Sequence, residues 1–169
     1  MKKIAFLFLI LSVALTGCFL NDDVATDQTG VIVDGGEIKS CVGPGVYSDG
    51  GYFTDLREVS NATLTFEVND PEVATKDSQL VGISVTIQAR RNNDCDSLTN
   101  LLTNWSALTA DDPLIAVISA TANEAMKVGA RQFTLTQLLD DRNGLATAIK
   151  DALEADAGKY STTIINVSI

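Results

Sequence analysis

Acidic side chains are the residues whose types and spacing come closest to a chemical site in this chain. Asn92, Asp94 and Asp96 repeat the alternation that opens a calcium-binding loop. Such a loop needs glycine at its sixth position and glutamate at its twelfth, where this chain has Ser97 and Thr103. We therefore interpret Asp96 as the N-cap of a helix and predict no metal site.

Three pairs of adjacent aspartates raise the question of paired-carboxylate catalysis. Neighbouring residues on a helix or strand do not point at a common centre, and negative charge near a helix start interacts favourably with the helix dipole. The chain has no histidine, which excludes histidine triads, histidine-ligated zinc and the commonest general base near neutral pH. We predict that the protein is not an enzyme and uses no cofactor. The pairs are Asp22/Asp23, Asp111/Asp112 and Asp140/Asp141.

Residues 1–17 have the composition of a cleavable export signal. Two lysines precede the apolar run Ile4–Gly17. As a helix this run is about 21 Å long at ~1.5 Å per residue, which is too short to cross a hydrocarbon core of roughly 30 Å. The run leads into the sequence Leu15-Thr16-Gly17-Cys18, which resembles the bacterial lipobox.

The lipobox resemblance implies cleavage before Cys18 and attachment of a diacylglyceryl group to its sulfur. The alternative is an ordinary signal peptide that contains a cysteine. Two or more acyl chains give stable anchoring, whereas one gives marginal binding. We expect an exported protein that a lipid on Cys18 anchors at the periplasmic face or cell surface of a bacterium.

The charge of the mature chain limits its partners. The full chain carries a net charge of −10, which becomes −12 when Lys2 and Lys3 leave with the signal. Because affinity for phosphate backbones comes from lysine and arginine, this balance argues against binding to nucleic acid. It also argues against a protein body that lies flat on anionic lipid, so we expect the lipid to supply the membrane contact.

Cys41 and Cys95 remain once the lipid occupies Cys18. An oxidising compartment permits a disulfide between them, which would be worth about 4 kcal/mol at most in the loop-entropy description. The alternative is that they are two separate small residues of an apolar core.

The residues that follow Cys18 predict a tether and then a set of strands. Residues 18–29 are polar without a clear period, as in a flexible tether. Asp34-Gly35-Gly36 is a strong turn signal between two strands. Apolar and polar residues alternate strictly over 81–90, which indicates a strand with one buried face. Further strands are expected at 30–33, 37–42 and 63–68, the last broken by Asn69-Asp70-Pro71.

Beyond residue 91 the apolar residues recur at helical spacing. A first helix carries Leu98, Leu101, Leu102 and Trp105 behind Asp96. Asp112-Pro113 is expected as the cap and first residue of a second helix that stops at Gly129. Thr134 to Gln137 fits a capping box, a further helix ends near Gly158, and 160–169 closes the chain as a strand. Strands, then helices, then one strand define an α+β domain.

These elements resemble the SPFH superfamily, also called the band 7 or prohibitin-homology domain, which includes stomatins, prohibitins and flotillins. The likeness covers 30–169. It is carried by Pro44-Gly45 after the first hairpin, by Val73-Ala74-Thr75-Lys76-Asp77 before the long strand Leu80–Arg90, by Leu138-Leu139-Asp140-Asp141-Arg142 before a helix, and by Tyr160 at the closing strand.

Three departures from the family pattern stand out. Members usually hold the membrane through a hydrophobic hairpin or transmembrane helix, a role that lipidated Cys18 would take here. They usually continue into a coiled coil, whereas this sequence stops at Ile169, so the chain is either a shortened form or one that assembles differently. Many have glycine after the tyrosine, where this chain has Ser161.

The resemblance implies a lipid-anchored, non-enzymatic scaffold that self-associates at a membrane and organises or protects client membrane proteins. The competing hypothesis is a monomeric lipoprotein that presents a protein-binding or small-molecule-binding surface. The expected partners are therefore the membrane, further copies of the chain and a membrane-protein client, but no nucleic acid.

Overall fold

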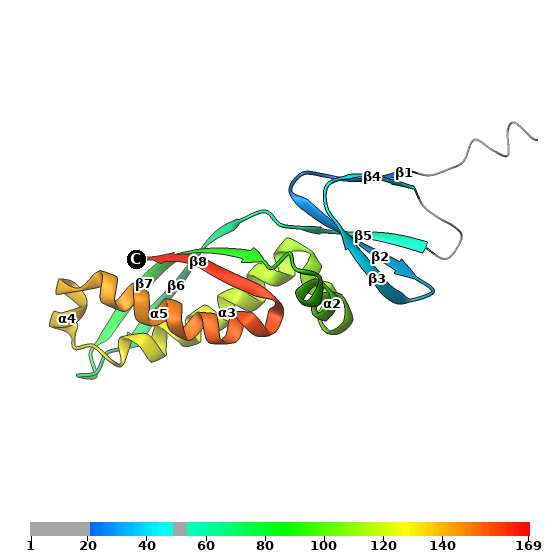
Figure 1. The fold of residues 1–169 in the computed structure, drawn as a ribbon. Coiled ribbons are helices and arrows are strands. Elements are labelled where there is room, and N and C mark those ends of the chain that lie inside the picture. Colours follow the sequence, from blue (N-terminus) through cyan, green and yellow to red (C-terminus); the bar gives the residue numbers. More distant parts are fainter. Residues whose placement is uncertain (1–20, 49–53) are drawn as a thin grey trace, which may run out of the picture. The chain divides into compact units, whose positions relative to one another are not determined.

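The computed structural model describes residues 21–48 and 54–169 and has the expected α+β organisation (Figure 1). Antiparallel strands come first, helices follow, and one strand closes the chain. The chain divides into two compact units, one up to Glu58 and one from Val59 onward. Cys18 and the predicted signal lie outside the described residues.

The first unit consists of short antiparallel strands. Its two-stranded sheet pairs β1 (Asn21–Val24) with β4 (Gly45–Ser48). A second sheet has the order β3-β2-β5. Its members are β2 (Gln28–Asp34), β3 (Glu37–Val42) and β5 (Thr54–Ser60), whose last two residues belong to the second unit.

The predicted tether is too long, because part of it is folded. Residues 21–24 form β1, and β2 already begins at Gln28. Val24 is only 2% exposed and belongs to the core of the first unit. A strand of four residues is too short for a period of two to be recognised in the sequence, which is why this part looked irregular.

The first hairpin turns where the sequence predicted. Asp34 pairs with Glu37, so Gly35 and Gly36 form a two-residue loop. Their φ angles are +59° and +88°. Positive φ at both central positions is the geometry that favours glycine and matches the twist of the flanking strands.

The second unit is built on a three-stranded antiparallel sheet of order β6-β7-β8. The strands are β6 (Leu64–Ala74), β7 (Leu80–Arg91) and β8 (Thr162–Ser168). The alternation predicted for β7 is confirmed, since Ile83, Val85, Ile87 and Ala89 are all buried. The central strand of this sheet therefore turns one apolar face toward the core.

Strand β6 is longer than the sequence suggested. It continues through Asn69-Asp70-Pro71 to Ala74, and its register with β7 shifts between Asp70 and Val73. Proline cannot donate to a ladder, but it is tolerated on an edge strand at a bulge. The predicted break is thus a bulge within one strand.

Helices cover the apolar face of this sheet (Figure 1). The two long ones, α3 (Asp111–Ala130) and α5 (Arg142–Ala157), pack against each other, α3 against β6 and α5 against β8. Gly129 allows α3 and α5 to approach each other closely, because a Cβ at this position would lie 3.0 Å from a side-chain carbon of Ile149. The remaining helical segments are α2 (Cys95–Asn104), η1 (Ser106–Thr109), α4 (Leu135–Asp140) and η2 (Gly158–Tyr160).

Two of the predicted helix caps were wrong by two residues. Asp94 caps α2 by accepting from the backbone N–H of Ser97, and Asp96 lies in the first turn. Helix α3 begins one residue before Asp112, behind Ala110, so Asp112 and Pro113 are both inside its first turn. Acidic residues fit either position because the cap and the first turn both favour negative charge.

Two other helix predictions hold. The capping box of α4 is present, with Thr134 and Gln137 each bonded to the backbone N–H of the other. Helix α5 ends at Ala157 with Gly158 as its C-cap, close to the expected end. Among the helices of 21–48 and 54–169, none combines the length and the apolar character needed to cross a membrane.

Candidate functional site

Arg91, at the end of β7, is a buried charged side chain that forms hydrogen bonds to three other segments. The alternation that buries Val85, Ile87 and Ala89 continues for one more step and puts Arg91 on the same inward face. Its side chain is 0% exposed. A fully buried guanidinium is rare unless it is paired, so its partners define the site.

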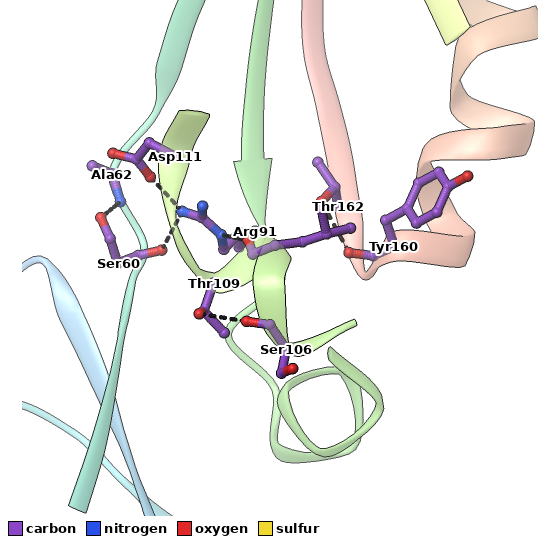
Figure 2. A network of polar contacts seen from close by, with 9 residues as sticks. Ser60, Ala62, Arg91, Ser106, Thr109, Asp111, Tyr160 and Thr162 are labelled. Atoms are coloured by element: carbon purple, nitrogen blue, oxygen red, sulfur yellow. Dashed lines mark hydrogen bonds and ion pairs between the residues drawn. The ribbon is translucent and has the colours of Figure 1, made fainter. Parts of the chain in front are cut away.

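The partners of Arg91 come from three segments (Figure 2). Its Nε donates to the carbonyl of Leu108 in η1 at 2.9 Å. Its Nη1 donates to the Asp111 carboxylate at 2.8 Å and, at 3.4 Å, to the carbonyl of Ser60 at the end of β5. One side chain therefore joins the end of β5, the short helix η1 and the first turn of α3.

The two side chains of the Arg91–Asp111 ion pair differ in their exposure to solvent. Arg91 is completely buried, whereas the Asp111 side chain is 49% exposed. The third guanidinium nitrogen, Nη2, has no hydrogen-bond partner in the part of the chain that the structure describes. A guanidinium stays charged at any ordinary pH and has no acceptor, so the arrangement provides fixed positive charge and geometry rather than proton transfer.

A second cluster forms at the turn between β6 and β7. The Thr75 hydroxyl donates to Asp77 at 2.6 Å and accepts from the backbone N–H of Gln79 at 3.0 Å. Asp77 also accepts from the N–H of Leu135, and Lys76 N–H donates to the carbonyl of Phe133. The Thr-x-Asp turn thus holds the start of α4 against the hairpin.

Hydrogen bonds to the Asp77 carboxylate favour its ionised form in this turn. The Thr75 hydroxyl holds the pKa of the Asp77 carboxyl below its ordinary value of 3.8, and the backbone N–H groups of Asp77 and Leu135 act in the same direction. Desolvation opposes them and is smaller than the hydroxyl contribution. Donors to a carboxylate favour its ionised form, so Asp77 works as an anionic acceptor.

Ser161 stands in a left-handed conformation with a φ of +52°. Glycine adopts such a φ without cost, which agrees with the glycine expected at this position from the family resemblance. Here the serine is buried and its hydroxyl accepts from the Asn100 amide at 3.1 Å, while its carbonyl accepts from Asn92 N–H at 2.8 Å. These contacts tie the start of β8 to α2 and to the end of β7.

The calcium-like run ending at Asp96 serves helix capping. Asp94 bonds the first turn of α2, and this lowers the pKa of its carboxyl. Asn92 accepts instead from the Thr163 hydroxyl. Residues 21–48 and 54–169 contain no group of three or more histidine, cysteine or acidic side chains placed to hold a metal.

The candidate site residues predicted from the sequence belong to different segments of the chain. Cys18, the lipid attachment residue, lies outside the described residues. Cys41 lies on β3, in the first unit, and Cys95 is the first residue of α2, in the second. A bridge between those two cysteines stays a prediction.

The aspartate pairs serve different purposes. Asp111 is the partner of Arg91, and Asp141 caps α5 by accepting from the N–H of Gly144. The pair at residues 22 and 23 lies in β1. Sequence reasoning missed Arg91, although the continued alternation from residue 83 to residue 91 was the signal that could have found it.

Large apolar side chains are also exposed on the second unit. Such groups mark contact surfaces when they lie together, but single ones are ordinary. They occur on β7, α3, α4 and β8, just after α2 and just after β8. The side chains are Leu80, Trp105, Val128, Leu139, Ile165 and Ile169.

A three-stranded antiparallel sheet covered by two long helices, with a buried arginine that joins the end of β7 to the first turn of α3, defines an α+β domain. The sequence pattern of the SPFH domain / Band 7 family matches residues 23–169. The chain belongs to this family. Its members are generally membrane-associated scaffolds of non-enzymatic type. No curated protein matches the chain.

Proposed function

We propose that this chain is a lipid-anchored, non-enzymatic SPFH scaffold that self-associates at a membrane and organises or protects membrane proteins. The observation that carries the proposal is the family match over residues 23–169 directly behind a lipobox at Cys18. Family membership supports the membrane-associated scaffold, and the lipobox supplies a means of attachment.

The spacing between Cys18 and the folded domain supports close attachment. The family match begins at residue 23, and five residues span at most about 18 Å at ~3.6 Å each. A lipid on Cys18 would therefore hold the first unit near the bilayer surface. Confinement to a surface raises the effective concentration of copies, so that a weak lateral contact becomes populated.

Cys18→Ser tests the anchor. In cells fed a labelled fatty acid, the wild-type chain should incorporate label and sediment with membranes. The variant should lose the label and either leave the membrane or remain as an unprocessed precursor. Cys41→Ser is the matched control, because it removes a cysteine elsewhere and should keep the label. Equal labelling of wild type and Cys18→Ser would contradict the proposal.

Assembly is tested by comparing soluble and lipidated forms. The mature charge of −12 makes copies repel in solution, so protein lacking residues 1–18 should sediment mainly as a monomer at micromolar concentration. Added salt should strengthen the soluble contact slightly by screening. The lipidated form should give a ladder of crosslinked species in intact membranes. Monomers in both forms would favour a monomeric binding lipoprotein instead.

We also propose the Cys41–Cys95 disulfide that an exported chain permits. Peptide mapping of the mature protein without reductant should find the two cysteine peptides joined, and mapping after reduction should find them separate. Recovery of both peptides unjoined from fresh, alkylated protein would show that the cysteines are not bridged to each other.

A further inference from the structure

The sheet of the second unit has two edges, and they differ in how they are protected. Strand β7 lies between β6 and β8, so each outer strand pairs with β7 alone among the described strands. An edge strand presents backbone N–H and C=O groups to any other strand that approaches. Natural edges are usually blunted by charge, proline or bulges.

Strand β6 carries all three of these devices. Its sequence includes Glu67, Asp70, Pro71 and Glu72, and its ladder has a bulge between Asp70 and Val73. Acidic side chains on an acidic protein repel a second copy, and proline removes a donor. This edge is built against strand addition.

Strand β8 has far weaker protection. Its sequence, Thr-Thr-Ile-Ile-Asn-Val-Ser, has no charged residue and no proline and is rich in β-branched residues. The Ile165 side chain is 40% exposed. Ile165 is also the extra residue of a bulge, and its carbonyl accepts from Lys150 Nζ at 3.3 Å. The Lys150 ammonium thus reaches this edge from α5 and bonds one carbonyl.

The charge of the chain indicates which strand would pair there. The full sequence has 22 acidic and 12 basic residues and a net charge of −10, so most ways of bringing two copies together oppose like charges. Pairing through β8 avoids this, because the strand itself is neutral. A two-fold contact of a strand with its own copy is antiparallel and self-complementary, and it joins two three-stranded sheets into one.

We propose that the outer edge of β8 is the contact between two copies of this chain, formed by antiparallel β8–β8 pairing across a two-fold axis. This inference rests on the proposed self-association and names the surface that performs it. Ile165 lies at the middle of the contact, and Lys150 remains on the α5 side of the edge.

The test uses the full, lipidated chain in its membrane. Ile165→Lys places a charge at the proposed contact, where its copy would face a like charge. Leu139→Lys on α4 is the matched control, because it adds the same charge at an aliphatic residue that is 65% exposed. Ile165→Lys should reduce the crosslinked dimer by about tenfold or more, and Leu139→Lys should leave it unchanged.

A cysteine scan along the strand supplies an independent readout. Thr163→Cys, Ile165→Cys, Asn166→Cys and Ser168→Cys occupy exposed positions of β8, and Val128→Cys on α3 is the control. Facing residues of paired strands are close enough for a disulfide. Oxidation in membranes should give a dimer of the chain most strongly at one β8 position and not at Val128.

The outcomes separate this inference from the function on which it rests. Wild-type oligomers that persist in Ile165→Lys, with no β8 position forming dimers, overturn the edge contact and leave the scaffold standing. Wild-type monomers alone overturn both. β8 cysteines that crosslink to a different protein, and not to a second copy, overturn the pairing of copies in favour of a client strand.

Discussion

The carboxylate of Asp111 lies 2.8 Å from the Arg91 guanidinium, which joins the first turn of α3 to the last residue of β7. The buried member of the pair is the one that also bonds the carbonyls of Ser60 and Leu108. The contribution of this network to stability therefore depends mainly on the arginine.

Arg91→Met should destabilise the second unit strongly. The change removes three hydrogen bonds and leaves buried carbonyls without a donor, a loss of about 3 kcal/mol in free energy of unfolding. Asp111→Asn should cost less, about 1 kcal/mol, because its side chain is half exposed and solvent screens it. Urea denaturation of protein lacking residues 1–18 measures both, and equal losses would contradict the assigned asymmetry.

Val85→Asp should be among the most damaging single changes. Val85 is 0% exposed on the central strand, and an unpaired carboxylate there costs several kcal/mol. Thr86→Lys is the control on the opposite, exposed face, where residue 86 pairs with Glu67, and it should change stability by no more than about 0.5 kcal/mol. A thermal melt of Val85→Asp that matches wild type would contradict the assigned face.

The Asp77 turn should make stability depend on pH in acid. Because its folded pKa lies below the ordinary 3.8, its contribution is complete above about 3.8 and is lost as the pH falls through the lower folded value. Asp77→Asn should therefore be less stable than wild type at pH 6, with the difference shrinking toward pH 2. Thr75→Val removes the main donor and should weaken the same pH dependence. A deficit independent of pH would show that ionisation of Asp77 is not what stabilises the turn.

Two substitutions of Ser161 separate the effect of its backbone strain on stability from the effect of its side-chain hydrogen bond. Ser161→Ala loses the bond from Asn100 and keeps a side chain at positive φ, so it should cost about 1 kcal/mol. Ser161→Gly loses the same bond but relieves roughly 1 kcal/mol of left-handed strain, so it should lie close to wild type. Thermal melts of the three proteins compare them directly. A glycine variant as unstable as the alanine variant would mean that the strain is negligible.

Elements with a long, regular period could be predicted from the sequence, and irregular ones could not. The alternation of β7, the Gly35-Gly36 turn and the capping box at Thr134 are local signals, and all three are confirmed. Strand β1 and the bulge at Pro71 depend on how one strand pairs with another, which the pattern of a single segment does not show.

Arg91 shows the same limit for the candidate site. Its position on the buried face follows from the alternation, but its partners at residues 60, 108 and 111 come from three separate segments. Their meeting depends on the tertiary fold. A charged residue at the end of a strand is usually exposed, so the residue type argued against the buried position that the alternation indicated.

The arrangement of the central sheet has a consequence for the time course of folding. β6 and β7 are neighbours along the chain, whereas the contact between Thr163 and Asn92 joins β8 to the end of β7 across 71 positions. Closing a loop of this length costs more entropy than forming the hairpin, and contacts between distant residues slow folding. The β6–β7 hairpin and the helices can form before β8 has been synthesised. The sheet, however, is completed only when β8 (Thr162–Ser168) pairs with β7, so β8 sets the moment at which the second unit becomes stable.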